Sequence, residues 1–363
     1  MKKLIATLLA LTMLASALAG CAGQPATSQP TEQPQATPSA VPSESGGEDA
    51  ATGATPEGAG VKTGLSVMTD LSSSKNASAE GDGLAQANIS LVAVTVDDEG
   101  VIQDCVIDMV QAKVNFSAAG GLTSDLSATV STKNELGPAY GMSKGSSIGK
   151  EWNEQAAAMA DYAVGKTVAE LKGISVNEKG APADADLSAS VTLSISDFLA
   201  GIEDAVNNAV HLGAKSGDRL ALASVTDLSG SKDASAEGAG LAQAYTTVAA
   251  VTFGGDVITS CHIDAVQANV NFDAAGAITT DLAAATQTKN QLGDSYGMKK
   301  ASSIGKEWYE QAAGFGAYVV GKTADEVAGI SVNEKGGAAD ADLSASVTIG
   351  IGDFLTLIEK AAQ

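Results

Sequence analysis

The sequence has few of the residues on which metal centres and nucleic-acid-binding surfaces depend. Its 363 residues include one arginine, two histidines and three cysteines, and no CxxCH, CxxC or HExxH pattern occurs. These absences argue against c-type haem, iron–sulfur clusters and zinc. No GxGxxG follows an expected strand, which argues against a dinucleotide-binding fold.

Basic and aromatic residues are also scarce. There are 21 Lys and Arg residues against 43 Asp and Glu, a formal net charge of −22, and aromatic residues make up 4 %. Such an acidic surface repels nucleic acid and anionic lipid headgroups, although an ordinary soluble secreted protein can have the same acidic charge. Because aromatic residues are scarce, the hydrophobic core must be built mainly from Ala, Val, Leu and Ile.

The N-terminus has the pattern of an export signal. Lys2 and Lys3 precede an apolar run over residues 4–15, which is shorter than the roughly 18 to 20 residues that a membrane span needs. Leu18-Ala19-Gly20-Cys21 resembles a bacterial lipobox. We therefore expect a signal peptide over residues 1–20, cleavage before Cys21 and a lipid anchor on its sulfur. The mature protein would sit on the extracellular face of the cell membrane.

Residues 21–60 are rich in Pro, Ser, Thr, Gln and Gly and have few large apolar side chains. This composition predicts a disordered tether after the lipidated cysteine, because it cannot bury enough surface to fold. A coil of this length spans roughly 35 Å on average. The tether is either a leash that lets the protein search the layer outside the membrane or a passive spacer.

The remainder of the chain repeats itself. Asp70 corresponds to Asp227 at a spacing of 157 residues, and Cys105 corresponds to Cys261 at a spacing of 156. We call residues 61–213 the first copy and residues 214–363 the second copy. A period this long indicates tandem domains, not a solenoid. The short connection between the copies predicts that they lie against each other.

Each copy is expected to be α+β, with strands followed by helices. In the first copy, alternation predicts strands over residues 90–96 and 101–114, joined by an acidic turn at residues 97–100 that is better explained as solvated than as a calcium site. Apolar spacing predicts helices over residues 152–164 and 194–210. Cys105 and Cys261 are expected to be buried small residues and not a redox pair.

One heptapeptide, DLSASVT, occurs in both copies, as residues 186–192 and 342–348. Each ends in a threonine ahead of an expected helix, where a hydroxyl can hold a phosphate by hydrogen bonds or as an ester. The alternative is ordinary helix capping, for example a capping box between Ser194 and Asp197. Identity at all seven positions, while neighbouring segments differ, favours a shared binding function.

The motif resembles the FMN-binding domain family of bacterial electron carriers. In that family the pattern Asp-Gly/Ala-x-Ser-Gly-Ala-Thr carries FMN, which an FMN transferase joins to the threonine through a phosphoester bond. The resemblance implies covalent FMN on Thr192 and Thr348, places Asp186 and Asp342 at the family aspartate, and places Ser190 and Ser346 at the glycine. Ala189 and Val191, with Ala345 and Val347 in the second copy, depart from the commonest form.

A second segment supports the resemblance. Its position in each copy looks like that of the Gly-rich loop that lies along the flavin ring in the family, where Tyr and Met beside glycines can form a wall for a planar ring. The alternative is an ordinary turn with core anchors. The implied cofactor-binding residues of this segment are Lys133, Tyr140 and Met142 in the first copy and Lys289, Tyr296 and Met298 in the second.

The lipobox, tether and duplicated motif together are similar to lipid-anchored flavoproteins of Gram-positive bacteria that carry two FMN-binding repeats. This resemblance implies an electron carrier, not an enzyme with its own substrate. It would take electrons from a membrane quinol-linked dehydrogenase and pass them to free flavin or ferric iron. The alternatives are a non-redox adhesion or ligand-binding lipoprotein on the same scaffold, and a flavin-dependent reductase with its own substrate pocket.

Overall fold

The computed structural model of the protein describes residues 55–363. The expected signal peptide, the lipidation of Cys21 and the tether up to residue 54 lie outside the described residues. Within the described part, no helix is long and apolar enough to cross a membrane. The last residues of the expected tether are bonded to the connection between the copies, since Gly58 N donates to Ser216 O at 2.9 Å.

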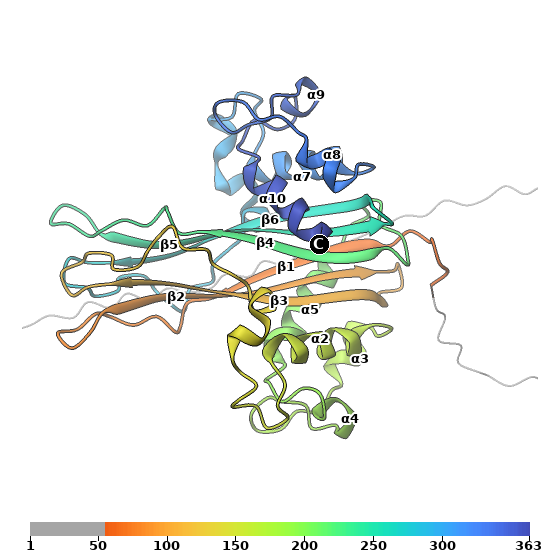
Figure 1. Ribbon diagram of the computed structural model, residues 1–363, viewed down its shortest axis with the longest axis horizontal. Coiled ribbons are helices and arrows are strands. Elements are labelled where there is room, and N and C mark those ends of the chain that lie inside the picture. Colours follow the sequence, from red (N-terminus) through yellow and green to blue (C-terminus); the bar gives the residue numbers. More distant parts are fainter. Residues whose placement is uncertain (1–54) are drawn as a thin grey trace, which may run out of the picture. The chain divides into compact units, whose positions relative to one another are not determined.

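Each copy contributes a three-stranded antiparallel sheet followed by helices, so the architecture is α+β (Figure 1). The elements of the first copy are β1 (Lys62–Asp70), β2 (Gly83–Val96), β3 (Ile102–Phe116), α1 (Lys133–Leu136), α2 (Trp152–Ala163), α3 (Val168–Lys172), α4 (Ala185–Ser188) and α5 (Ser196–Asn207). Those of the second are β4 (Arg219–Asp227), β5 (Gly240–Gly254), β6 (Val257–Phe272), α6 (Lys289–Leu292), α7 (Trp308–Val319), α8 (Ala324–Ala328), α9 (Ala341–Ser344) and α10 (Gly352–Ala362).

The two expected strands of the first copy form one long hairpin. β2 and β3 pair antiparallel around a turn at residues 97–101, and β2 starts seven residues earlier than the alternation predicts. The turn is not wholly solvated, because Asp97 is buried and accepts hydrogen bonds from Val101 N and the Thr55 hydroxyl. A further strand, β1, pairs with β2 and is not among the strands expected from the sequence.

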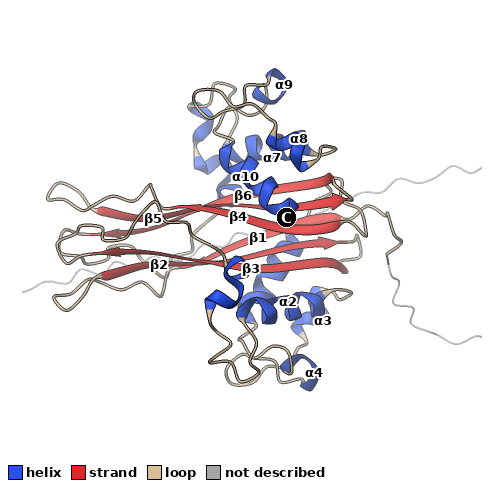
Figure 2. Ribbon diagram, in the orientation of Figure 1, coloured by secondary structure: helices blue, strands red, loops and turns tan. Residues whose placement is uncertain are grey.

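The two sheets pack face to face and share one hydrophobic core (Figure 2). Their facing sides are lined largely by alanine and valine, as the scarcity of aromatic residues predicts. Small side chains let two sheets approach closely over most of their length. One aromatic pair joins them, because the rings of Phe116 and Phe272 stack with centroids 4.2 Å apart.

Helices cover the outer face of each sheet, which gives a helix–sheet–sheet–helix arrangement (Figure 1). α2 and α5 pack on the first sheet, and α7 and α10 on the second. The crossing of α5 over β1 requires glycine at position 64, since a Cβ there would lie 2.0 Å from the Ala205 carbonyl oxygen. The outer layers contain the heptapeptide that occurs in both copies, so the candidate sites lie in these layers.

Contacts near the ends of the long hairpins are reciprocal. Ala77 N donates to Gly276 O, and its counterpart Ala234 N donates to Gly120 O. Both glycines have positive φ, and a Cβ on either would lie under 3.0 Å from an alanine of the other copy. Each copy thus contributes equivalent residues to the contact between the copies, as in a two-fold interface between identical subunits.

Candidate functional site

The motif threonines lie in short loops between two helices. Thr192 is half-buried between α4 and α5, and Thr348 is exposed between α9 and α10. The helix after the motif starts later than the apolar pattern predicts, at Ser196, and its N-cap, Ile195, makes no side-chain hydrogen bond. The alternative of a capping box between Ser194 and Asp197 is not formed: the Ser194 hydroxyl instead hydrogen-bonds the Ser196 hydroxyl at 2.7 Å.

A buried glutamine fixes each threonine. Gln155 Oε1 accepts from Thr192 N at 2.8 Å and from the Thr192 hydroxyl at 3.2 Å. Gln311 Oε1 accepts from Thr348 N and its hydroxyl at the same two distances. Both glutamine side chains are fully buried on the first turns of α2 and α7. These glutamines are not among the residues predicted from the sequence, although their identity in both copies on an otherwise apolar helical face is a usable signal.

The aspartates of the motif are exposed, and they do not cap the helical turn. Asp186 and Asp342 lie in the first turns of the four-residue helices α4 and α9. The cap is instead the preceding aspartate: Asp184 Oδ1 accepts from the backbone N–H of residues 186 and 187, and Asp340 does the same in the second copy. The side chains of Ser190 and Ser346 are half-buried, and the Ser346 hydroxyl bonds the Leu343 carbonyl.

The second predicted segment is held by the start of the same helix. The buried Glu151 carboxylate, just before α2, accepts from Met142 N at 2.7 Å and Ser143 N at 3.0 Å. Glu307 holds Met298 N and Lys299 N in the same way. The N-terminal end of α2 or α7 therefore brings both predicted segments of each copy together.

Lys133 and Lys289 are buried under aromatic rings. Lys133 Nζ lies 4.7 Å from the Tyr140 ring centroid and 4.8 Å from that of Trp152, and Lys289 lies at similar distances from Tyr296 and Trp308. Such cation–π contacts hold the ammonium and orient the rings. The lysines thus support the Tyr-Gly-Met segment from inside the protein.

Burial shifts the pKa values of two charged groups in the second copy, Asp264 and Lys289. It raises the pKa of Asp264 to about 6, although hydrogen bonds from Asn290 N and Ala265 N favour the carboxylate. Burial also lowers the pKa of Lys289 to about 8, against the attraction of Asp264 and Asp353. Both shifts arise because a low-dielectric interior disfavours the charged form.

A hollow of about 470 Å³ lies beside the start of the second motif. Its lining includes Tyr318, Lys322, whose Nζ lies 4.5 Å from the Tyr318 ring centroid, and the capping Asp340. All eight lining residues have identical counterparts in the first copy, where Lys166 lies over Tyr162. The hollow was not predicted from the sequence, because its lining residues come from three separate segments of the chain.

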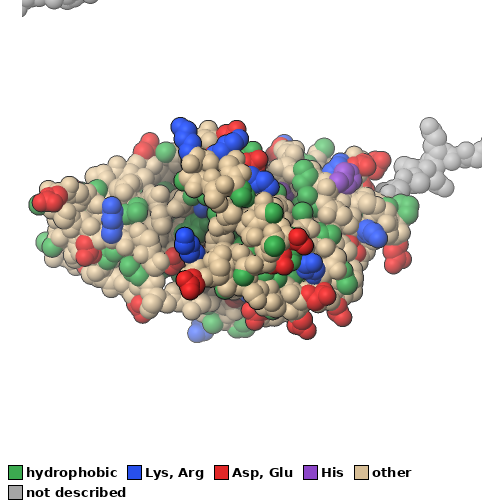
Figure 3. Space-filling view, turned by 90° about the horizontal axis from the view of Figure 1, so that it is seen from above, with side chains coloured by type: hydrophobic (Ala, Val, Ile, Leu, Met, Phe, Trp, Pro, Cys, Tyr) green, Lys and Arg blue, Asp and Glu red, His purple; other side chains and the backbone are tan. Residues whose placement is uncertain are grey.

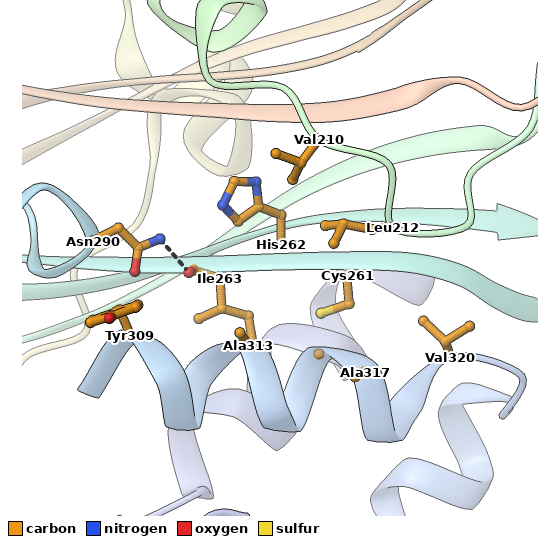
Figure 4. A pocket seen from close by; sticks show the side chains of 11 residues that line it. Val210, Leu212, Cys261, His262, Ile263, Asn290, Tyr309, Ala313, Ala317 and Val320 are labelled. Atoms are coloured by element: carbon orange, nitrogen blue, oxygen red, sulfur yellow. Dashed lines mark hydrogen bonds between the residues drawn. The ribbon is translucent and has the colours of Figure 1, made fainter. Parts of the chain in front are cut away.

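A different, mostly apolar cavity of about 250 Å³ lies between β6, α7 and the connection after α5 (Figure 4). Cys261 points toward α7, and His262 points to the opposite side of β6, toward Val210 (Figure 4). Burial lowers the pKa of His262 and raises that of the Cys261 thiol to about 12. Cys105 and Cys261 are both buried and free, so the expectation of buried, unpaired cysteines is confirmed.

The residues around each threonine fit an attached phosphate-bearing group. Thr348 is an exposed residue and its hydroxyl donates to Gln311 Oε1, so an ester at that oxygen would replace this hydrogen bond. Gly149 and Gly305, in the loop before each helix, have open space where a Cβ would lie. Among residues 55–363, no group of three or more His, Cys, Asp or Glu residues is placed to hold a metal ion.

Charge is distributed over the surface without one dominant patch on the face shown in Figure 3, where acidic and basic side chains are interspersed.

Comparisons with protein-family models, with curated proteins and with solved structures found no match to this chain.

Proposed function

We propose that the protein is a lipid-anchored electron carrier whose two copies are homologous FMN-binding-type domains, each with FMN esterified to its motif threonine. The observation that carries the proposal is the repeated geometry of Thr192 and Thr348. In both copies a buried glutamine accepts hydrogen bonds from the threonine N–H and hydroxyl, and the threonine itself is half-buried in the first copy and exposed in the second. An FMN transferase needs such a positioned and accessible hydroxyl.

The proposal gives the surrounding residues distinct roles. Gln155 and Gln311 orient the threonine, and the exposed Asp186 and Asp342 are available for recognition by the transferase. Tyr140, Met142 and their counterparts provide a wall for the ring, with the buried lysines behind them. Bound FMN would supply the redox chemistry, and the protein would attach and orient it.

The resemblance supplies the proposed partners. A membrane quinol-linked dehydrogenase would donate electrons, and free flavin or ferric iron would accept them outside the cell. Attachment through Cys21 to the extracellular face of the membrane would keep the carrier near its donor. A covalent bond suits this location, because a dissociating cofactor would be lost to the medium.

The test is co-expression with an FMN transferase, followed by intact mass and visible absorbance. The wild type should carry two FMN groups per chain. Thr192→Ala and Thr348→Ala should each carry one, and the double variant should be colourless, because the ester oxygen is removed.

Thr323→Ala is the matched control, since Thr323 caps α8 in the second copy and lies outside the motif. It should retain both FMN groups. Covalent flavin on the double threonine variant would contradict the attachment sites. A wild type that takes up no flavin would favour the non-redox alternative.

A further inference from the structure

The two copies differ at one polar cavity on the outer face of the sheet. In the first copy a cavity of about 270 Å³ lies between β1, β2, β3, α1 and the start of α5. Lys133 lines it, and this lysine is 7 % exposed. Within residues 55–363, the Lys133 ammonium makes no hydrogen bond and has no carboxylate within 4.0 Å; its contacts are with the aromatic rings.

In the second copy the corresponding space is filled. Tyr245 occupies the place of Asn88, and its hydroxyl accepts a hydrogen bond from Lys289 Nζ at 2.9 Å. The Thr247 hydroxyl donates to Asp353 at 3.4 Å. The first-copy counterparts of Thr247 and Asp353 are Ser90 and Asp197. Both line the cavity, and within the described residues no hydrogen bond joins their side chains. The second copy therefore satisfies internally the groups that the first copy leaves free.

The Lys133 ammonium lines the cavity and, within the described part of the chain, contacts only the faces of two aromatic rings, so an anionic oxygen in the cavity would accept a hydrogen bond from it, as the Tyr245 hydroxyl does from Lys289. Asp70 and Asp197 are exposed and bring carboxylates to the same cavity, where they favour a cationic group and disfavour a dianion. Met68 and Met109 also line the cavity and add apolar surface to its wall.

We propose that the first copy binds a small zwitterion of the α-amino-acid class in this cavity, with its carboxylate on Lys133 and its ammonium toward Asp70 and Asp197. The second copy does not bind it, because the Tyr245 ring occupies the site. This binding is independent of flavin attachment and is measured on protein that carries no FMN.

The test is isothermal titration calorimetry of the full chain, prepared without the transferase, against each standard amino acid at up to about 10 mM. At least one should bind with a stoichiometry of one per chain. Asn88→Tyr should abolish binding, and the variant should fold because it copies the arrangement of the second copy. Tyr245→Asn should raise the stoichiometry to two, since it opens the second cavity.

Tyr245→Phe is the matched control: it loses the hydroxyl but keeps the ring, so the stoichiometry should stay at one. Propionate and propylamine, which carry one charge each, should bind at least about tenfold more weakly than the amino acid. Equal binding of propionate would overturn the zwitterion assignment. Binding that survives Asn88→Tyr, or no binding by any amino acid, would overturn the site itself.

Discussion

At the scale of single residues, buried carboxylates organise the loops that lead to the candidate site. Asp264 Oδ1 accepts from Asn290 N at 3.0 Å and so fixes the start of α6, and Asp108 does the same for Asn134 in the first copy. Burial raises the pKa of both carboxyls, to about 6 for Asp264. These groups therefore link the stability of the protein to pH.

Asp264→Asn tests this link. The native carboxyl holds a proton up to about pH 6, whereas the unfolded one releases it near its ordinary value of 3.8. Between these values the native state binds more protons, so the contribution of Asp264 to stability increases as pH falls. Relative to the variant, the wild type should gain about 1 kcal/mol in free energy of unfolding between pH 7 and pH 5, measured with urea. A constant difference across this range would show an ordinary pKa.

The sequence alone proposes the two threonines as candidate sites but does not show what holds them. Two identical heptapeptides were sufficient to select Thr192 and Thr348. The support of Gln155 depends on a helix and a loop 37 residues apart, and only folding brings these together. Likewise, the difference between Asn88 and Tyr245 has no visible consequence until the sheet places each beside its lysine.

At the scale of elements, the amphipathic pattern located the two long helices of the first copy, α2 and α5, but not its shorter helices. The apolar spacing over residues 152–164 matches α2, which covers Trp152–Ala163. The nine-residue β1 was missed, and its pattern is interrupted by Gly64, a residue disfavoured in strands. That glycine is required by the close crossing of α5, which is a tertiary reason that no local pattern reveals.

The stacked rings of Phe116 and Phe272 join the ends of β3 and β6 and provide a test of the sheet-to-sheet packing. Phe116→Ala should lower the free energy of unfolding by about 3 to 5 kcal/mol, because the ring is fully buried and leaves a cavity. Phe272→Ala should cost a similar amount. The double variant should cost less than the sum by about 1 kcal/mol, the value of a stacked pair. Strict additivity in urea denaturation would mean that the rings do not interact.

At the scale of the whole molecule, the two copies resemble two subunits of a dimer fused into one chain. Asn76 accepts from Ile278 N, and its counterpart Asp233 accepts from Leu122 N, which is the counterpart of Ile278. Each sheet buries an apolar face that only the other sheet covers. A single copy in isolation would expose that face to water, and exposed apolar patches of this kind drive association.

Residues 55–213 expressed alone should therefore form a homodimer. The reciprocal contacts are self-complementary, so Asn76 of one chain would accept from Leu122 N of the next in the way that it accepts from Ile278 N here. Light scattering after size exclusion should give twice the chain mass. Phe116→Arg in the fragment should shift it toward monomer or aggregate, because it places a charge in the shared core, whereas the exposed change Lys113→Arg should leave the dimer intact. A stable, well-folded monomer of 55–213 would show that each copy completes its own core and that the shared core of the full chain is dispensable.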